Sequence, residues 1–136
     1  MSFHDAVVYQ IYPKSFRDSD GDGVGDLRGI IDKVPYIASL GVDYVWFNPF
    51  YPSPGHDNGY DISDYCAVDP AMGTMEDFDE LAAALGAHGI SPMLDMVLNH
   101  VSTEHGDLLF SVVNVARLLK VEPESSLEKT VNKFIA

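Results

Sequence analysis

An aspartate-rich loop is the most distinctive candidate for chemistry in this sequence. Residues 18–26 read Asp-Ser-Asp-Gly-Asp-Gly-Val-Gly-Asp, with carboxylates at loop positions 1, 3, 5 and 9 and a backbone carbonyl available at position 7. Because alternate residues of a tight turn point inward and Ca²⁺ collects oxygen ligands, this rhythm is typical of a calcium loop. Gly29 stands where an EF-hand needs a bidentate glutamate, so the likeness is one of spacing only. The alternative is a solvated acidic loop, in which four aspartates would repel one another without a cation.

Two further segments carry side chains suited to a ligand. Residues 55–62 read Gly-His-Asp-Asn-Gly-Tyr-Asp-Ile, and residues 95–100 read Asp-Met-Val-Leu-Asn-His. Carboxylates accept hydrogen bonds from several hydroxyls while an aromatic ring covers the apolar face of a sugar, so the first segment suits carbohydrate, although such loops are often only turns. A lone histidine, as in the second segment, is more often structural. On their own, the two segments favour carbohydrate weakly.

The elements that position these segments alternate between strand and helix. β-Branched, aromatic and apolar runs predict three strands, at residues 6–12, 42–47 and 90–98. Apolar residues at helical spacing predict helices over 27–40 and 74–85, and Pro35 is expected to break or kink the first. This order predicts right-handed βαβ units, a parallel sheet and the α/β fold class. Each polar segment follows a strand, which is where parallel sheets place their chemistry.

Composition excludes several classes of function. The 136 residues include 21 Asp plus Glu against 8 Lys plus Arg, for a formal net charge of −13. This charge repels phosphate backbones and anionic headgroups, so neither nucleic acid nor a membrane is an expected partner. No apolar run reaches the roughly 18 residues of a membrane span. The start lacks a signal-peptide pattern and the single Cys66 permits no internal disulfide, so we expect a soluble, cytoplasmic protein.

Taken in order, these segments resemble the α-amylase superfamily of retaining glycoside hydrolases, especially its oligo-1,6-glucosidase and α-glucosidase branch. The matching stretches lie within residues 1–105 and read VVYQIYPKSFRDSDGDGVGDLRGI, YIASLGVDYVWFNPFYPSP, HDNGYDISDY, GTMEDFDEL and DMVLNHVSTEH. The resemblance implies that this part forms the first three βα units of a (β/α)8 TIM barrel.

The resemblance also implies roles for individual residues. It implies that the branch's structural calcium or magnesium ion is held by Asp18, Asp20, Asp22, Asp26 and the Val24 carbonyl. It implies that an α-glucoside or oligosaccharide is held by Asp57, Tyr60 and His100, with Asp95 and Asn99 as structural supports. Retaining hydrolysis needs a nucleophilic carboxylate and a general acid about 5 Å apart. In this family both lie on later barrel strands, so no catalytic residue is expected in this sequence and the chain is predicted to be inactive.

The last thirty residues have a different character. Whereas residues 1–105 carry the whole net charge, residues 106–136 are neutral, and their apolar spacing predicts an α-helical hairpin. The tail resembles the C-terminal part of the all-α, magnesium-dependent MazG-type nucleoside triphosphate pyrophosphohydrolases, through Glu104-x-x-Asp107, LLFSVVNVAR and Asn132-Lys133-Phe134. That family's EExxE motif does not occur, and an amphipathic hairpin with incidental similarity is the alternative. A junction is therefore predicted near 104–107, by natural fusion, a rearranged reading frame or an artificial join.

Three functions follow in order of preference. The first is a fragment of an α-glucosidase-type glycoside hydrolase, made of a partial barrel over 1–105 and a helical tail over 106–136. The second is a remnant of a nucleotide pyrophosphohydrolase, and the third is a noncatalytic metal- or sugar-binding module. Three strands of a barrel leave open sheet edges and an apolar face without its opposite wall, so we also expect self-association.

Overall fold

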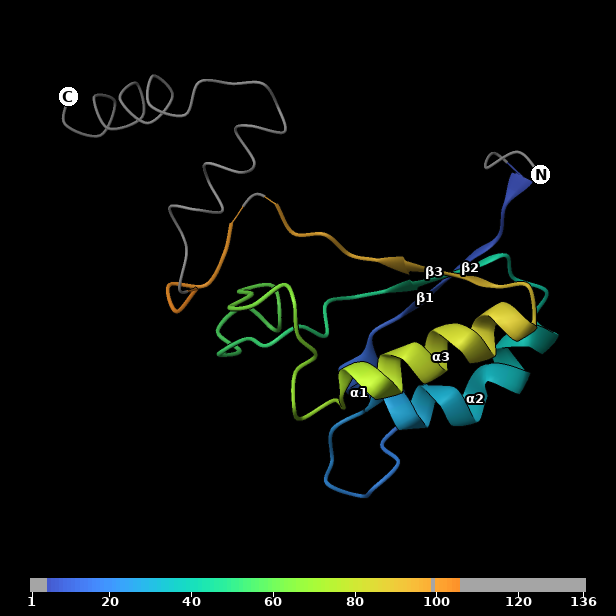
Figure 1. Ribbon diagram of the computed structural model, residues 1–136, viewed down its shortest axis with the longest axis horizontal. Helices are drawn as coiled ribbons and strands as arrows, with labels where there is room; N and C mark the ends of the chain where they lie inside the picture. The colour runs from blue at the N-terminus through green and yellow to red at the C-terminus, as the bar shows by residue number, and fades with distance from the viewer. Residues whose placement is uncertain (1–4, 99, 106–136) are drawn as a thin grey trace.

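Three parallel strands and the helices between them make up the computed structural model, which describes residues 5–98 and 100–105 (Figure 1). The elements follow in the order β1 (Val8–Ile11), α1 (Pro13–Phe16), α2 (Leu27–Ser39), β2 (Tyr44–Phe47), α3 (Met75–Ala87) and β3 (Ser91–Leu94). The predicted alternation of strand and helix is confirmed. The predicted tail hairpin over 106–136 lies outside the described residues. Among those described, no helix has the length and apolar character needed to cross a membrane.

The strands lie in chain order, and their carboxyl ends are level. β1 pairs with β2 and β2 with β3, and the last partners in the two ladders are Ile11 with Phe47 and Phe47 with Leu94. The ladder continues one step, because Asn48 N–H donates to Ile11 O at 2.9 Å and Asp95 N–H donates to Phe47 O at 3.1 Å. Residues that directly follow the strands therefore emerge at one edge of the sheet.

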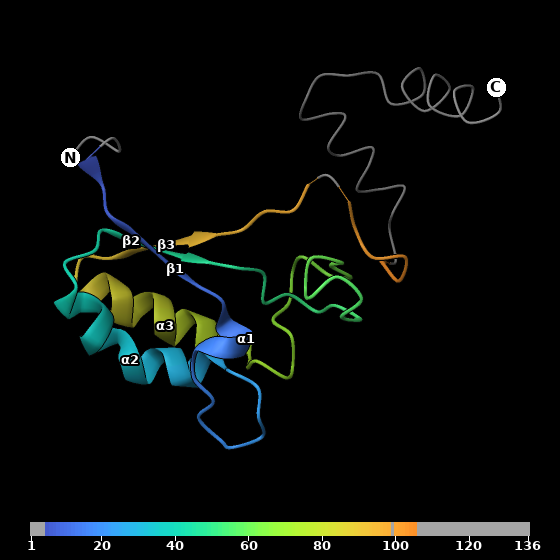
Figure 2. The same ribbon diagram turned by 180° about the vertical axis from the view of Figure 1, so that it is seen from behind.

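Both long helices cover the same face of the sheet, as the two opposite views show (Figures 1 and 2). The core beneath them is formed by apolar side chains of both layers: Ile11, Val45 and Phe47 from the strands, Leu27, Ile30, Val34 and Ile37 from α2, and Leu81 and Leu85 from α3. Arg28 of α2 joins the two helices by ion pairs with Asp77 and Glu80 of α3, each at 2.6 Å. The other face of the sheet exposes Trp46 and Val8.

Pro35 lies inside α2 without ending it, so the helix predicted over 27–40 continues to Ser39. A proline inside a helix costs about 3 kcal/mol or more, and buried Val34 and Ile37 on either side of it supply compensating contacts with the core. The third strand ends at Leu94 rather than at residue 98, because β2, its partner, already ends at Phe47.

Two glycines allow the chain around α1 to pack against α2. A Cβ atom added to Gly29, inside α2, would lie 2.2 Å from the carbonyl oxygen of Arg17, and one added to Gly25 would lie 2.1 Å from that of Pro13. These distances are far below van der Waals contact, and the atoms met are backbone. Gly86, inside α3, has no such neighbour within 4 Å.

The two helical glycines should therefore respond oppositely to alanine. Gly29→Ala should lower the free energy of unfolding by about 2 kcal/mol or more, because the backbone must shift to relieve the overlap. Gly86→Ala should raise it by about 0.5–1 kcal/mol, because alanine loses less backbone entropy in a helix. Urea unfolding followed by circular dichroism measures both. Equal effects of the two substitutions would contradict the close approach at Gly29.

Candidate functional site

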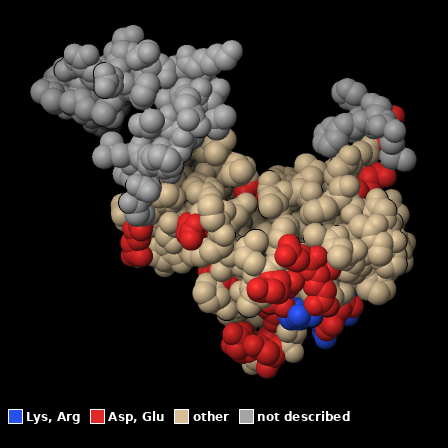
Figure 3. All heavy atoms as spheres, in the orientation of Figure 1, with Lys and Arg blue, Asp and Glu red and all other residues tan. Residues whose placement is uncertain are grey.

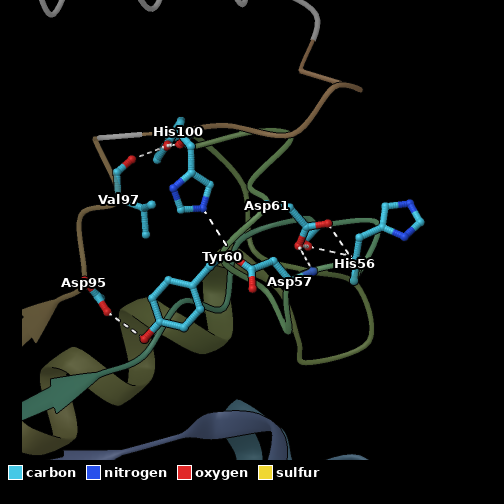
Figure 4. A network of polar contacts seen from close by, with 10 residues as sticks. His56, Asp57, Tyr60, Asp61, Asp95, Val97 and His100 are labelled. Atoms are coloured by element: carbon cyan, nitrogen blue, oxygen red, sulfur yellow. Dashed lines mark hydrogen bonds and ion pairs between the residues drawn. The ribbon is translucent and has the colours of Figure 1, made fainter.

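A loop from the second βα unit returns to the carboxyl edge of the sheet and meets Asp95 there. Asp95 follows β3 directly, and Tyr60, from the loop after β2, donates its hydroxyl hydrogen to Asp95 Oδ2 at 3.1 Å (Figure 4). Asn48, which follows β2 directly, donates from Nδ2 to the hydroxyl oxygen of Tyr60 at 2.6 Å. The sheet edge thus holds the Tyr60 side chain from two strands.

His100 and Asp57 form the outer part of the same network. Nε2 of His100 lies 3.4 Å from Oδ2 of Asp57, and the two side chains are 41% and 64% exposed. Figure 4 shows the imidazole pointing toward Asp57, with Tyr60 and Asp95 on the side of the sheet. The structure therefore brings together Asp57, Tyr60, His100 and Asp95, as the sequence predicts, and it leaves polar atoms of Asp57 and His100 open to solvent. Asn99 lies outside the described residues.

Burial changes the acidity of the tyrosine in this network. Loss of hydration raises the pKa of Tyr60 above its ordinary value, and Asp95 adds to the rise because a carboxylate opposes a phenolate beside it. The hydrogen bond from Asn48 acts in the opposite direction, since it favours the phenolate. Tyr60 is therefore a neutral phenol over the physiological range.

Asp61 fixes the turn that carries Asp57. Its carboxylate accepts hydrogen bonds from Ser53 Oγ at 2.6 Å, from the His56 N–H at 2.8 Å and from the Asp57 N–H at 3.1 Å. The side chain is buried, with 8% exposure. Burial alone would raise its pKa, but the three donors outweigh that effect and lower the pKa from 3.8 to about 2. Asp61 is thus an ionised anchor of the loop.

A small aromatic cluster joins this loop to the segment after β3. Tyr51, Ile62 and Val97 are buried against one another, with Tyr60 and Tyr65 packed on them. Tyr65 donates its hydroxyl hydrogen to the Val97 carbonyl oxygen, and Ser102 N–H donates to Ile62 O at 2.9 Å. These contacts hold the segment with Asp95 and His100 beside the loop with Asp57 and Tyr60.

Sequence reasoning missed Asn48 and Asp61 as parts of this site. Asn48 stands directly after the predicted strand over 42–47, so the same strand-end argument that selected Asp95 would have found it. Nothing in the sequence predicted the buried position of Asp61, because an aspartate in a loop with two glycines could equally be exposed to solvent.

The aspartate-rich loop brings three of its four carboxylates together. Ligand atoms of Asp18, Asp20 and Asp22 all lie within 4.8 Å of one another. Asp18 organises the turn, because its carboxylate accepts from the N–H groups of Gly21 at 2.6 Å, Gly23 at 2.8 Å and Asp20 at 3.1 Å. The bonds from Gly23 and Gly21 lower the pKa of Asp18. Three carboxylates held this close suit a hard cation with oxygen ligands.

The other two predicted metal ligands belong to the same loop but have further contacts. Asp26 is the N-cap of α2, where its Oδ1 accepts from Gly29 N–H at 2.6 Å and its Oδ2 accepts from Ser19 N–H at 2.8 Å. Val24 donates its N–H to Asp22 Oδ1 at 2.7 Å. Figure 3 shows acidic side chains over the lowest part of that view, where the loop between α1 and α2 lies. Metal binding by Asp26 and the Val24 carbonyl stays a prediction.

The fold and the site define a class: the chain belongs to the α-amylase family, whose catalytic-domain model, described as "Alpha amylase, catalytic domain", matches residues 10–116. Its three parallel strands and covering helices are the first βα units of a (β/α)8 barrel, as predicted. The MazG-type resemblance and the boundary at 105–106 stay predictions.

Individual relatives match about three quarters of this chain. The oligo-1,6-glucosidase of Bacillus cereus is 56% identical over 101 residues, which are 74% of this chain and 18% of that enzyme. The crystal structure of trehalose-6-phosphate hydrolase from Bacillus licheniformis is 56% identical, with a TM-score of 0.73 over 74% of this chain and 18% of that one. A trehalulose synthase mutant in complex with sucrose, from an enzyme of Pseudomonas mesoacidophila MX-45, is 54% identical, with a TM-score of 0.72 over the same shares. The chain thus spans about one fifth of the length of these relatives.

Asp61 should make stability depend on pH in acid. Its pKa is lower in the folded chain than the ordinary value of 3.8, so its contribution is complete above about pH 5 and is lost as pH falls toward its folded value of about 2. The free energy of unfolding of wild type should therefore exceed that of Asp61→Asn at neutral pH, and the difference should shrink toward pH 2.

Ser63→Ala is the matched control for this titration. Ser63 lies in the same loop and donates to the carbonyl oxygen of Pro52 at 2.9 Å, without a titrating group of its own. Its effect on the free energy of unfolding should be independent of pH over the same range. A difference between wild type and Asp61→Asn that stays constant with pH would contradict the anchoring role of the ionised carboxylate.

Proposed function

We propose that this chain forms the part of an α-glucosidase-type glycoside hydrolase that holds the nonreducing glucosyl unit of an α-glucoside. The observation that carries the proposal is the network of Asp57, His100, Tyr60 and Asp95 at the carboxyl edge of the sheet. Barrel enzymes build their active sites at this edge. The relatives support the same substrate class, since two are named as a glucosidase and a trehalose-6-phosphate hydrolase and one holds sucrose.

The exposed side chains of Asp57 and His100 suit the hydroxyl groups of a sugar, and the half-buried Tyr60 suits the sugar ring. Asp57 offers acceptor oxygens to hydroxyl groups, and His100, whose Nε2 lies 3.4 Å from Asp57 Oδ2, offers a ring N–H. Tyr60, held through its hydroxyl, keeps its ring face for the apolar side of the sugar. These residues bind and orient, while cleavage depends on a pair of carboxylates that the family places on later strands.

Binding without turnover is the expected behaviour of the 136-residue chain. It should bind methyl α-glucoside weakly, with Kd in the range of about 1 mM or above, as measured by ligand-observed NMR. His100→Ala should weaken binding about tenfold. No hydrolysis of p-nitrophenyl α-glucoside should be detected.

The control for this experiment is His88→Ala, because His88 is exposed at the end of α3, away from the carboxyl edge. It should leave the affinity unchanged. Equal loss of affinity in both variants would count against the site, and measurable hydrolysis would show that the chain carries a catalytic pair that sequence reasoning missed.

We further propose that Asp18, Asp20 and Asp22 hold a structural calcium or magnesium ion, with Asp26 and the Val24 carbonyl as the remaining candidates. The ion would neutralise three adjacent carboxylates. Because a ligand that binds only the folded chain adds RT ln(1 + [L]/Kd) to its stability, calcium at a hundredfold excess over Kd should add about 2.7 kcal/mol.

Asp20→Ala should abolish most of this stabilisation, whereas Asp79→Ala, an exposed aspartate of α3, should retain it. Thermal unfolding with calcium, with magnesium and with EDTA separates the cases. An identical melting temperature with calcium and with EDTA would refute the metal site.

We also propose that the chain self-associates through the uncovered face of its sheet. Among the described residues, Val8 and Trp46 are exposed on this face, and Met96 and Leu98 are exposed in the segment after β3. Exposed apolar patches and open strand edges favour association. Size-exclusion chromatography with light scattering should give a mass above 14.9 kDa, and Trp46→Lys should lower it. A sharp monomer for the wild-type chain would contradict the proposal.

A further inference from the structure

Four side chains form one chain of hydrogen bonds across all three strands at the carboxyl edge. Gln10 of β1 donates from Nε2 to Asn48 Oδ1 at 2.9 Å, and Asn48 donates from Nδ2 to the Tyr60 hydroxyl at 2.6 Å. Tyr60 then donates to Asp95 Oδ2 at 3.1 Å. Gln10, at the start of this chain, lies 38 residues from Asn48 in sequence, so only the aligned strands bring them together.

The direction of every bond in this chain follows from the charge of Asp95. An ionised carboxylate can only accept, so the single hydroxyl hydrogen of Tyr60 must point to Asp95. The Tyr60 oxygen can then only accept from Asn48, which requires the Nδ2 end of that amide. The Oδ1 end of Asn48 consequently faces Gln10, and Gln10 must donate. The Asn48 amide thus has one orientation that satisfies both of its neighbours, and the Gln10 amide has one that satisfies Asn48.

We propose that Gln10 and Asn48 are positioning residues, which fix the hydroxyl hydrogen of Tyr60 on Asp95 and so hold the Tyr60 ring in place for the glucosyl unit. The proposal rests on the proposed function, since it concerns the same site. Gln10 and Asn48 act through Tyr60. Because the phenol is bonded on both sides, rotation of its ring away from the network breaks two hydrogen bonds at once.

The reversal of one amide provides the sharpest test. In Gln10→Glu the new carboxylate can only accept, so it should draw the Nδ2 end of Asn48 toward β1 and leave Oδ1 facing Tyr60. In Asn48→Leu the donor to Tyr60 is removed outright. Both variants take away a hydrogen bond that favours the phenolate, so both should raise the pKa of Tyr60.

The readout is a spectrophotometric titration of tyrosinate in the full chain. Each variant is titrated with and without Tyr60→Phe, so that the difference isolates Tyr60 from the other six tyrosines. Titration in high salt separates the charge that Gln10→Glu adds from the reversal of the amide, because salt screens the first. Affinity for methyl α-glucoside, from ligand-observed NMR, should fall about tenfold in both variants.

Tyr12→Phe is the control variant. Tyr12 donates to the carbonyl oxygen of Asn58 at 2.8 Å, in the loop that carries Tyr60, but does not belong to the hydrogen-bonded series from Gln10 to Asp95. Besides Asp95, it is the other titratable group whose charge raises the pKa of Tyr60, so its removal should not produce a rise. Circular dichroism establishes that each variant is folded, and if Asn48→Leu does not fold, Gln10→Glu decides.

The outcomes separate this proposal from the proposed function. A raised pKa of Tyr60 together with weakened glucoside binding supports both. An unchanged pKa in the folded variants overturns the positioning role, as does a raised pKa with unchanged affinity. The wild-type chain could also bind no glucoside while the variants still raise the pKa of Tyr60. That result would show that Gln10 and Asn48 orient Tyr60, but it would overturn the proposed function and the role of Tyr60 in holding a glucosyl unit.

Discussion

The level carboxyl ends of three parallel strands are the constraint on which this site depends. Ile11, Phe47 and Leu94 end their ladders side by side, and the next backbone N–H groups, of Asn48 and Asp95, are still bonded to the neighbouring strand. A slip of one residue in either ladder would turn the side chain after that strand to the opposite face of the sheet. The positions of the side chains in the polar network therefore depend on the pairing of the strand backbones. Helices α2 and α3 stabilise this pairing by burying one face of the sheet.

The loop that supplies Asp57 and Tyr60 is held by different forces at its two ends. Near Asp57, the buried carboxylate of Asp61 gathers two backbone N–H groups and a hydroxyl, which is a local electrostatic arrangement. Near Tyr60, the contacts are long-range, through Asn48 and Asp95 of the sheet edge. The exposed groups of the site therefore stand on a rigid base, as binding sites require if little ordering entropy is to be lost with the ligand.

The sequence was sufficient for the order of the elements and for the proximity of the polar segments that follow β2 and β3. Strand patterns ended by polar residues predicted where Asp95 and the loop with Tyr60 would meet, because that argument needs only parallel topology. The sequence was insufficient where a residue type is compatible with two different structural roles. Gly29 was interpreted as a missing metal ligand, whereas the structure shows a close approach to the Arg17 carbonyl. The helix predicted over 27–40 is not ended at Pro35, because the contacts of buried Val34 and Ile37 with the core outweigh the tendency of proline to break a helix.

The single carboxylate of Asp26 joins two points that are ten residues apart in the chain. One oxygen accepts from Ser19, near the beginning of the aspartate-rich loop, and the other accepts from Gly29, in the first turn of α2. The hydrogen bond from Ser19 to Asp26 therefore closes the loop. Because the same carboxylate caps α2, closing the loop, with its entropic cost, and forming the first turn of the helix depend on each other. Amide hydrogen exchange at Ser19 and Gly29 should accordingly be governed by one opening event, in which the first turn of α2 frays as the loop opens.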